Sequence, residues 1–71
     1  MLETDEKLMV SEQMLKLHEV DLYRAEVNLK IADAVGRDDL AAQHTDLIQA
    51  LQKAISVIKA EIQETAGQCE K

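Results

Sequence analysis

No proline interrupts this 71-residue chain, and its only glycines are Gly36 and Gly67. The residues on either side of Gly36 are mostly Leu, Ala, Glu, Lys, Gln and Met, which are good helix formers. Apolar residues recur there at steps of three and four, the spacing of one face of an α-helix. The sequence therefore predicts two long helices joined by a turn. The expected bounds are about 5–35 for the first helix, 36–38 for the turn, about 39–66 for the second helix and 67–71 for a frayed tail.

A turn this short forces two helices to lie antiparallel and side by side. Gly36 is expected to adopt the left-handed conformation that closes the first helix. Thr4 is expected to cap the start of the first helix, and Asp38 or Asp39 the start of the second. The predicted fold is all-α: residues 1–71 form a single domain, an antiparallel two-helix hairpin (αα-hairpin) completed by association with another chain.

The predicted second helix is amphipathic, with one apolar side and one polar side. At about 100° per residue its apolar side chains gather into one stripe, which needs one neighbouring helix to cover it. The first helix is the obvious neighbour. The expected core residues of the second helix are Leu40, Leu47, Leu51, Ala54, Ile55, Ile58 and Ile62, with Ile48 at the border of the stripe.

The predicted first helix carries two apolar stripes, separated by more than a quarter-turn. The first, which we call the leucine seam, alternates large and small side chains every seven residues, a pattern typical of coiled-coil packing. The leucine seam consists of Leu8, Ser11, Leu15, His18, Leu22, Ala25, Leu29 and Ala32. The other, which we call the second stripe, consists of Val10, Met14, Leu17, Val20, Val27, Ile31 and Val35. On the narrow polar arc, Glu12–Lys16 and Glu26–Lys30 are expected to form ion pairs.

Only one of these stripes can face the second helix, and the sequence leaves open which one. We assign Leu8, Leu15, Leu22, Ala25 and Leu29 to the core inside the hairpin, and the second stripe to a partner protein. Left in water, the second stripe would be a contiguous apolar patch of a kind that monomers avoid. Covering a few hundred Å² of it would contribute about 5–10 kcal/mol before association costs. The alternative is that both stripes form one broad face wrapped around the second helix.

Three polar residues, Asp21, Arg24 and Asn28, lie among the residues of the second stripe. A wholly apolar partner surface would leave these side chains without hydrogen-bond partners. They predict a partner with polar groups of its own.

Composition excludes several classes of function. Fourteen Asp and Glu against eight Lys and Arg give a net charge of −6, which argues against nucleic-acid binding and against an anionic membrane surface. The longest apolar runs are too short to cross a bilayer, and the acidic start is unlike a secretion signal. The single cysteine, Cys69, cannot form an internal disulfide, which favours a reducing compartment. We expect a soluble cytoplasmic protein, stabilised by another chain because a core this small supplies only about 3–5 kcal/mol.

The sequence shows no pattern typical of catalysis or of metal or cofactor binding. Two histidines, His18 and His44, and Cys69 are too few and too far apart for a closed metal site. Both histidines are expected to be partly buried and hydrogen-bonded, with a pH-sensitive contact as the alternative. A two-helix hairpin has no enclosed pocket in which reacting groups could be desolvated. We therefore expect no enzyme, no catalytic residues, no metal and no cofactor.

The turn Gly36-Arg37-Asp38-Asp39 and the stretch Ala50-Leu51-Gln52-Lys53-Ala54-Ile55-Ser56-Val57-Ile58 resemble the YscE-like family, small co-chaperones of type III secretion needle subunits. The resemblance covers about residues 27–60. It implies a helical hairpin with a non-catalytic role in protein transport and virulence. Such a protein binds a larger chaperone of tetratricopeptide-like repeats, and together they keep the needle subunit soluble and unpolymerised in the bacterial cytoplasm. The resemblance assigns no contact residues.

A second hypothesis is a homodimer or higher oligomer in which two hairpins form an antiparallel four-helix bundle. Plasmid copy-control proteins with this architecture bind RNA through a basic face, which this sequence lacks. The homodimer would therefore be a structural or protein-binding module without enzymatic activity.

Overall fold

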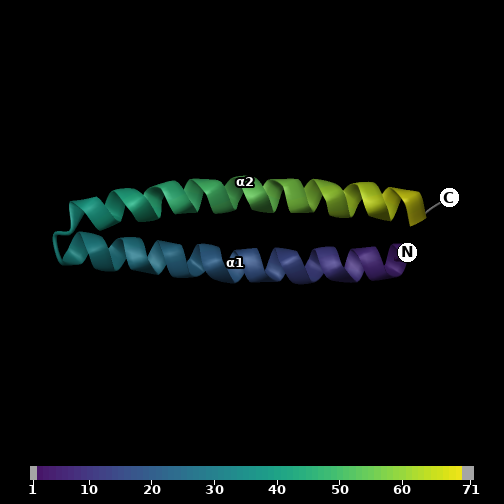
Figure 1. Cartoon of the computed structure of the whole chain (residues 1–71), viewed down its shortest axis with the longest axis horizontal. Coiled ribbons are helices and arrows are strands. Elements are labelled where there is room, and N and C mark those ends of the chain that lie inside the picture. The colour runs from purple at the N-terminus through teal and green to yellow at the C-terminus, as the bar shows by residue number, and fades with distance from the viewer. Residues whose placement is uncertain (1, 70–71) are drawn as a thin grey trace.

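The computed structural model describes residues 2–69, and its two helices lie side by side and antiparallel (Figure 1). Helix α1 spans Thr4–Ala34 and α2 spans Asp38–Cys69, 31 and 32 residues respectively. The hairpin measures 54 × 17 × 14 Å, so it is little wider than two packed helices. No strand occurs among the described residues. The predicted all-α helical hairpin is confirmed.

The turn between the helices is closed by backbone hydrogen bonds. Gly36 has φ +73°, the predicted left-handed conformation. The N–H of Arg37 donates to the carbonyl of Ala32 at 2.9 Å, and the N–H of Gly36 donates to the carbonyl of Asp33 at 3.2 Å. These two bonds form a Schellman motif, which satisfies carbonyls that the end of α1 leaves free. The turn occupies residues 35–37, one position earlier than the sequence predicts.

Helix α1 is capped by Glu3 and not, as predicted, by Thr4. Glu3 has extended backbone angles and precedes the first helical residue, Thr4. Its N–H donates to Oε1 of Glu6 at 3.3 Å, one half of a capping box. The prediction for Thr4 was wrong because a glutamate one position earlier fulfils the capping role in its place.

Helix α2 starts beside a two-bond contact between Arg37 and Asp39. The Nε and Nη2 groups of Arg37 donate to the two carboxylate oxygens of Asp39, each at 3.2 Å. The Arg37 side chain, followed by the backbone N–H of Leu40, lowers the pKa of the Asp39 carboxyl from its usual 3.8. Asp38 and Asp39 both lie inside the first turn of α2, where negative charge is favoured, rather than before it as a capping residue would.

The end of α2 differs from the prediction. The helix continues to Cys69, so residues 67–69, expected in a frayed tail, are helical. The last two residues of that predicted tail, 70–71, lie outside the described part of the chain. Gly67 does not end α2, because a glycine inside a helix costs only about 1 kcal/mol relative to alanine.

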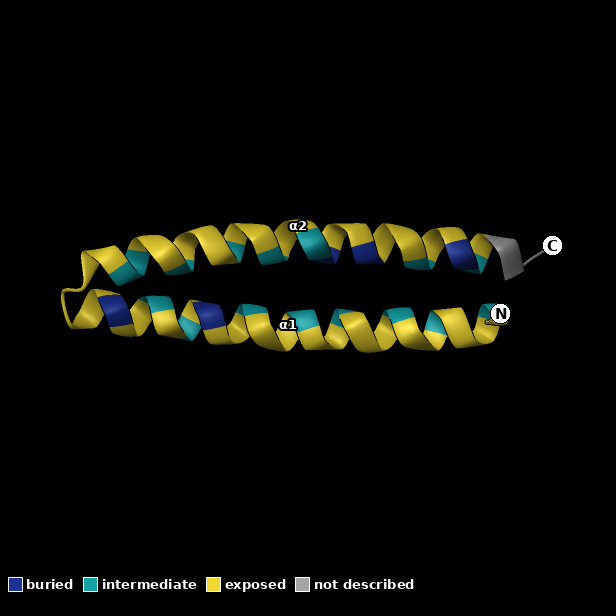
Figure 2. Ribbon diagram, viewed as in Figure 1, coloured by how far each residue is buried: buried dark blue, intermediate teal, exposed yellow. Residues whose placement is uncertain are grey.

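The two helices contact each other through seven-residue repeats. Buried and half-buried positions line the facing sides of α1 and α2, and exposed positions the outer sides (Figure 2). Every residue of the leucine seam is buried or half-buried, and Ala25 is only 1% exposed. The leucine seam is thus the stripe of α1 that faces α2. The matching repeat on α2 consists of Ala41, His44, Ile48, Leu51, Ile55, Ile58, Ile62 and Thr65, all buried or half-buried.

Leu47, expected in the core, is 47% exposed, and Ile48, expected at the border, is half-buried. The other predicted core residues of α2 are buried or half-buried. The error arises because a repeat of seven drifts by about 20° per heptad from an ideal straight helix. A stripe drawn at 100° per residue therefore includes Leu47, whereas the seven-residue repeat includes Ile48 in its place.

Replacing Gly36 by alanine should lower the free energy of unfolding by about 1–2 kcal/mol, because a side chain disfavours the left-handed conformation. An added Cβ would meet nothing within 4 Å at either Gly36 or Gly67, so only backbone conformation distinguishes the two sites. Gly67→Ala, in the right-handed α2, should therefore be neutral or stabilising by up to about 1 kcal/mol. Urea unfolding measures both; equal effects of the two substitutions would contradict this account of the turn.

Candidate functional site

The second stripe lies on the outer side of α1, away from α2. Six of its seven residues are exposed, and Leu17 and Val35 each expose 64% of their surface. Val27 is half-buried. Whereas the apolar residues of α2 gather on one side, those of α1 form two stripes that are more than a quarter-turn apart. The structure therefore leaves one continuous apolar stripe uncovered along most of α1.

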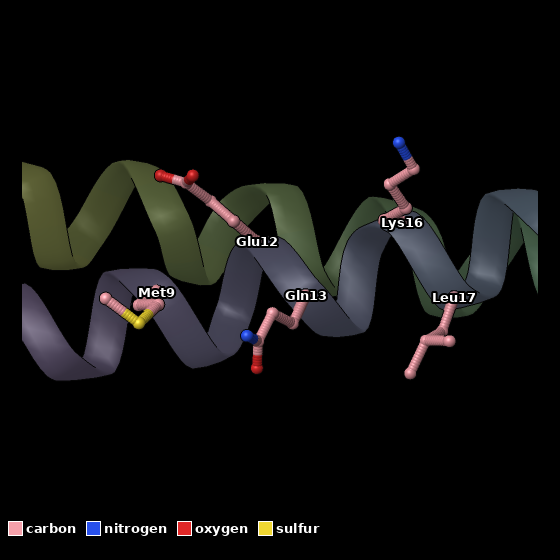
Figure 3. A pocket seen from close by; sticks show the side chains of 5 residues that line it. All are labelled: Met9, Glu12, Gln13, Lys16 and Leu17. Atoms are coloured by element: carbon pink, nitrogen blue, oxygen red, sulfur yellow. The ribbon is translucent and has the colours of Figure 1, made fainter.

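The amino-terminal half of this stripe borders a shallow, open hollow of about 550 Å³. It is lined mostly by carbon atoms of Met9, Glu12, Gln13, Lys16 and Leu17. Figure 3 shows Glu12 and Lys16 along one edge of this face of α1, Gln13 and Leu17 along the other, and Met9 between them. Met9 is 62% exposed and belongs to this surface, although it is not in the second stripe as defined from the sequence. Because Met9 lies seven residues before Lys16 and eight before Leu17, helical spacing alone could have shown that it shares a face of α1 with them.

The predicted ion pairs Glu12–Lys16 and Glu26–Lys30 are absent. Among residues 2–69 the only ion pair is Arg37–Asp39. Exposed pairs of this kind are worth only a few tenths of a kcal/mol, too little to hold two long side chains together. The Lys16 ammonium therefore remains unpaired at the edge of the second stripe.

The carboxy-terminal half of the stripe has two smaller hollows, and Arg24 borders both. One, of about 340 Å³, is lined by Tyr23, Arg24, Val27 and Asn28. The other, of about 230 Å³, lies between the helices. Its lining residues are Asp21, Arg24, Ala25, Asn28, Leu47 and Leu51. Leu47, which the sequence predicts in the core, is exposed. It extends the apolar surface from α1 onto the edge of α2.

The hairpin exposes more surface than a compact protein of its mass. Its accessible surface is 5539 Å², whereas a folded monomer of 8.0 kDa has about 4,450 Å². Its radius of gyration is 16.0 Å, compared with about 11 Å for a compact chain of 71 residues. The excess of about 1,100 Å² is comparable to the 800 Å² that one partner contributes to a standard protein interface.

The two histidines lie between the helices. His18 is half-buried, and its Nδ1 donates to the carbonyl of Met14 at 2.7 Å, one turn earlier. His44 is also half-buried.

Within the part of the chain that the structure describes, no group of three or more His, Cys, Asp or Glu residues could hold a metal ion. Neither α1 nor α2, as far as described, is both long and apolar enough to cross a membrane.

These features make the outer face of α1 the candidate functional site. An apolar stripe with a few polar groups suits the docking of another amphipathic element, because burying it removes carbon surface from water. No protein-family model, curated protein or solved structure matches the chain.

Proposed function

We propose that this hairpin is a small cytoplasmic co-chaperone, or adaptor, that binds a larger helical-repeat chaperone through the second stripe of α1. In this proposal the two proteins together keep a bacterial type III secretion needle subunit soluble and unpolymerised. The observation that carries the proposal is the largely exposed stripe from Val10 to Val35, which is separate from the leucine seam that faces α2. Its finer part, the secretion system, rests on the resemblance of the turn and α2 to the YscE-like family.

The energetics favour a protein partner. A hairpin with one helix–helix interface has little stability of its own, and a bound partner adds stability by mass action. Covering the second stripe would let α1 bury both of its apolar sides, one against α2 and one against the chaperone. Helical repeats present concave surfaces made of parallel helix faces, which suit a long, narrow stripe of this kind.

The test is purification of the tagged chain from the bacterium that encodes it, followed by mass spectrometry of the proteins that elute with it. We expect a helical-repeat chaperone together with a needle subunit, in fixed stoichiometry. A tagged Leu17→Asp variant is the matched control, because it alters the second stripe alone. Recovery of the chain without a chaperone, or equal recovery with Leu17→Asp, would contradict the proposal.

The alternative is a homodimer that covers the second stripe with the same stripe of a second copy. The exposed stripe favours this as a candidate, since a four-helix bundle is a common way to complete a hairpin. A committed homodimer would have one stoichiometry and a melting temperature that rises with protein concentration. For the co-chaperone we expect weak, mixed self-association that the chaperone displaces. Analytical ultracentrifugation with and without the chaperone distinguishes the two.

A further inference from the structure

Asp21 and Arg24 lie at the middle of the second stripe and give it charges of both signs. Both side chains are exposed and line the same hollow between the helices. They do not pair with each other, because among residues 2–69 the single ion pair is Arg37–Asp39. A surface with one positive and one negative charge at its centre can pair with an inverted copy of itself.

The residues of this surface recur at alternating steps of four and three, so they meet in register when α1 lies against an antiparallel copy of itself. The midpoint of the surface falls between Leu22 and Tyr23. A two-fold axis at that midpoint places Asp21 of each copy opposite Arg24 of the other, which gives two reciprocal ion pairs. From the end of the surface to its centre, the facing pairs are Val10 with Val35, Met14 with Ile31, Leu17 with Asn28 and Asp21 with Arg24. Only one of these pairs sets an apolar side chain against a polar one.

Helix α2 matches itself about the same axis. Leu47 and Leu51 line the hollow that Asp21 also lines, so α2 presents Leu47 on the same side of the hairpin. Ala50 and Ala54, three and seven residues after Leu47, continue this side of α2. The axis crosses α2 between Ala50 and Leu51. It therefore places the large Leu47 of one copy opposite the small Ala54 of the other, and the small Ala50 where α2 meets its own copy.

The geometry and area of the hairpin suit this arrangement. The two stripes of α1 are more than a quarter-turn apart, as in a four-helix bundle, where each helix packs against two neighbours. The excess surface of about 1,100 Å² is larger than the roughly 800 Å² that one partner contributes to a standard interface. Each copy has a net charge of −6, so two copies repel each other overall. The interface is thus specific in geometry and weak enough to dissociate on dilution.

We infer that the free chain forms a two-fold symmetric dimer, a four-helix bundle in which α1 packs against α1 and α2 against α2 of a second copy, with Asp21–Arg24 pairs across the axis. This inference goes beyond the proposed function, because it concerns the chain without its chaperone. A second copy occupies the surface assigned to the chaperone, so the two exclude each other.

Opposite charge changes beside the axis test the pairing. Asp21→Arg surrounds the axis with four positive charges, and Arg24→Asp surrounds it with four negative charges. We expect sedimentation equilibrium to give each variant a dimer dissociation constant at least about tenfold above that of the wild type. Mixed in equal amounts, the two variants should form a dimer of one copy of each, with a dissociation constant within about threefold of the wild type.

Two features of this design separate pairing from net charge. Asp21→Arg makes the chain less negative than −6, so it would strengthen association if overall repulsion governed it. Lys59→Asp changes the net charge as much as Arg24→Asp does. Lys59 is exposed and lies more than a third of a turn around α2 from Ala54, away from the interface. Its dissociation constant should stay within about threefold of the wild type, and circular dichroism should show all variants equally helical.

A wild type that stays monomeric at millimolar concentration, single variants that dimerise as tightly as the wild type, or a mixture no tighter than its components would overturn the inference. A free chain that is monomeric and binds only the chaperone would assign the second stripe to that partner alone. The proposed function fails separately, when no chaperone is recovered from cells. The dimer would then stand without it.

Discussion

Substituting Leu17 by aspartate is expected to abolish partner binding and to leave the isolated hairpin folded. Leu17 is 64% exposed on the outer side of α1, so its loss removes little contact within the chain. Aspartate is a poorer helix former than leucine by about 0.5 kcal/mol, which sets the scale of the expected destabilisation. In the complex, the same carboxylate would lie against apolar surface, and affinity should fall by about a hundredfold or more.

Leu15→Asp is the matched control, two residues earlier on the same helix. Leu15 belongs to the leucine seam and is half-buried against α2. An unpaired carboxylate there should cost about 3 kcal/mol or more, enough to unfold a fold of this size. Circular dichroism should show helical signal retained in Leu17→Asp and largely lost in Leu15→Asp. If both variants unfolded, the second stripe would be part of the hairpin core and its assignment to a partner would be wrong.

Ile58→Ala is expected to destabilise the hairpin by about 2–4 kcal/mol, because it removes carbon atoms from a packed site and leaves a cavity. Ile58 is 8% exposed, among the most buried large side chains of the molecule. Since the total stability is about 3–5 kcal/mol, this loss leaves only about 1 kcal/mol, and the isolated variant should be partly unfolded near room temperature. Thermal unfolding followed by circular dichroism measures the loss.

Val57 provides the control for Ile58, since it is the adjacent residue and is 68% exposed. Val57→Ala should change the free energy of unfolding by less than about 0.5 kcal/mol, and alanine's better helix propensity could even make it stabilising. A similar loss in both variants would mean that the face of α2 turned toward α1 is not the one described.

Much of the fold follows from sequence features that have few alternatives. The absence of proline and the position of Gly36 predict two helices and a tight antiparallel turn, and the structure has both. The details that the sequence did not predict depend on small energy differences. Glu3 competes with Thr4 for the capping position of α1, and the predicted ion pairs on the polar arc contribute too little free energy to form. The error at Leu47 came from the choice of helical period over many turns.

The candidate site is predicted from sequence less completely than the fold. The second stripe follows from its spacing, but the sequence could not decide which stripe faces α2, because both have apolar residues at suitable intervals. The structure places the leucine seam there, with Ala25 and Ala32 allowing the helices to approach closely. Met9 and the hollows beside Arg24 depend on side-chain conformation, which a helical repeat alone does not specify.

We propose that the outer face of α1 is exposed in the free chain and covered in the functional complex. Carbene footprinting with mass spectrometry tests it directly, on the dilute chain and on the complex purified from cells. We expect strong labelling of Leu17 and Ile31 and weak labelling of Ile55 and Ile58 in the free chain. In the complex, labelling of Leu17 and Ile31 should fall several-fold while exposed Val57 is unchanged. Equal labelling of α1 in the two states, or protection of Leu17 and Ile31 in the dilute monomer, would contradict the account.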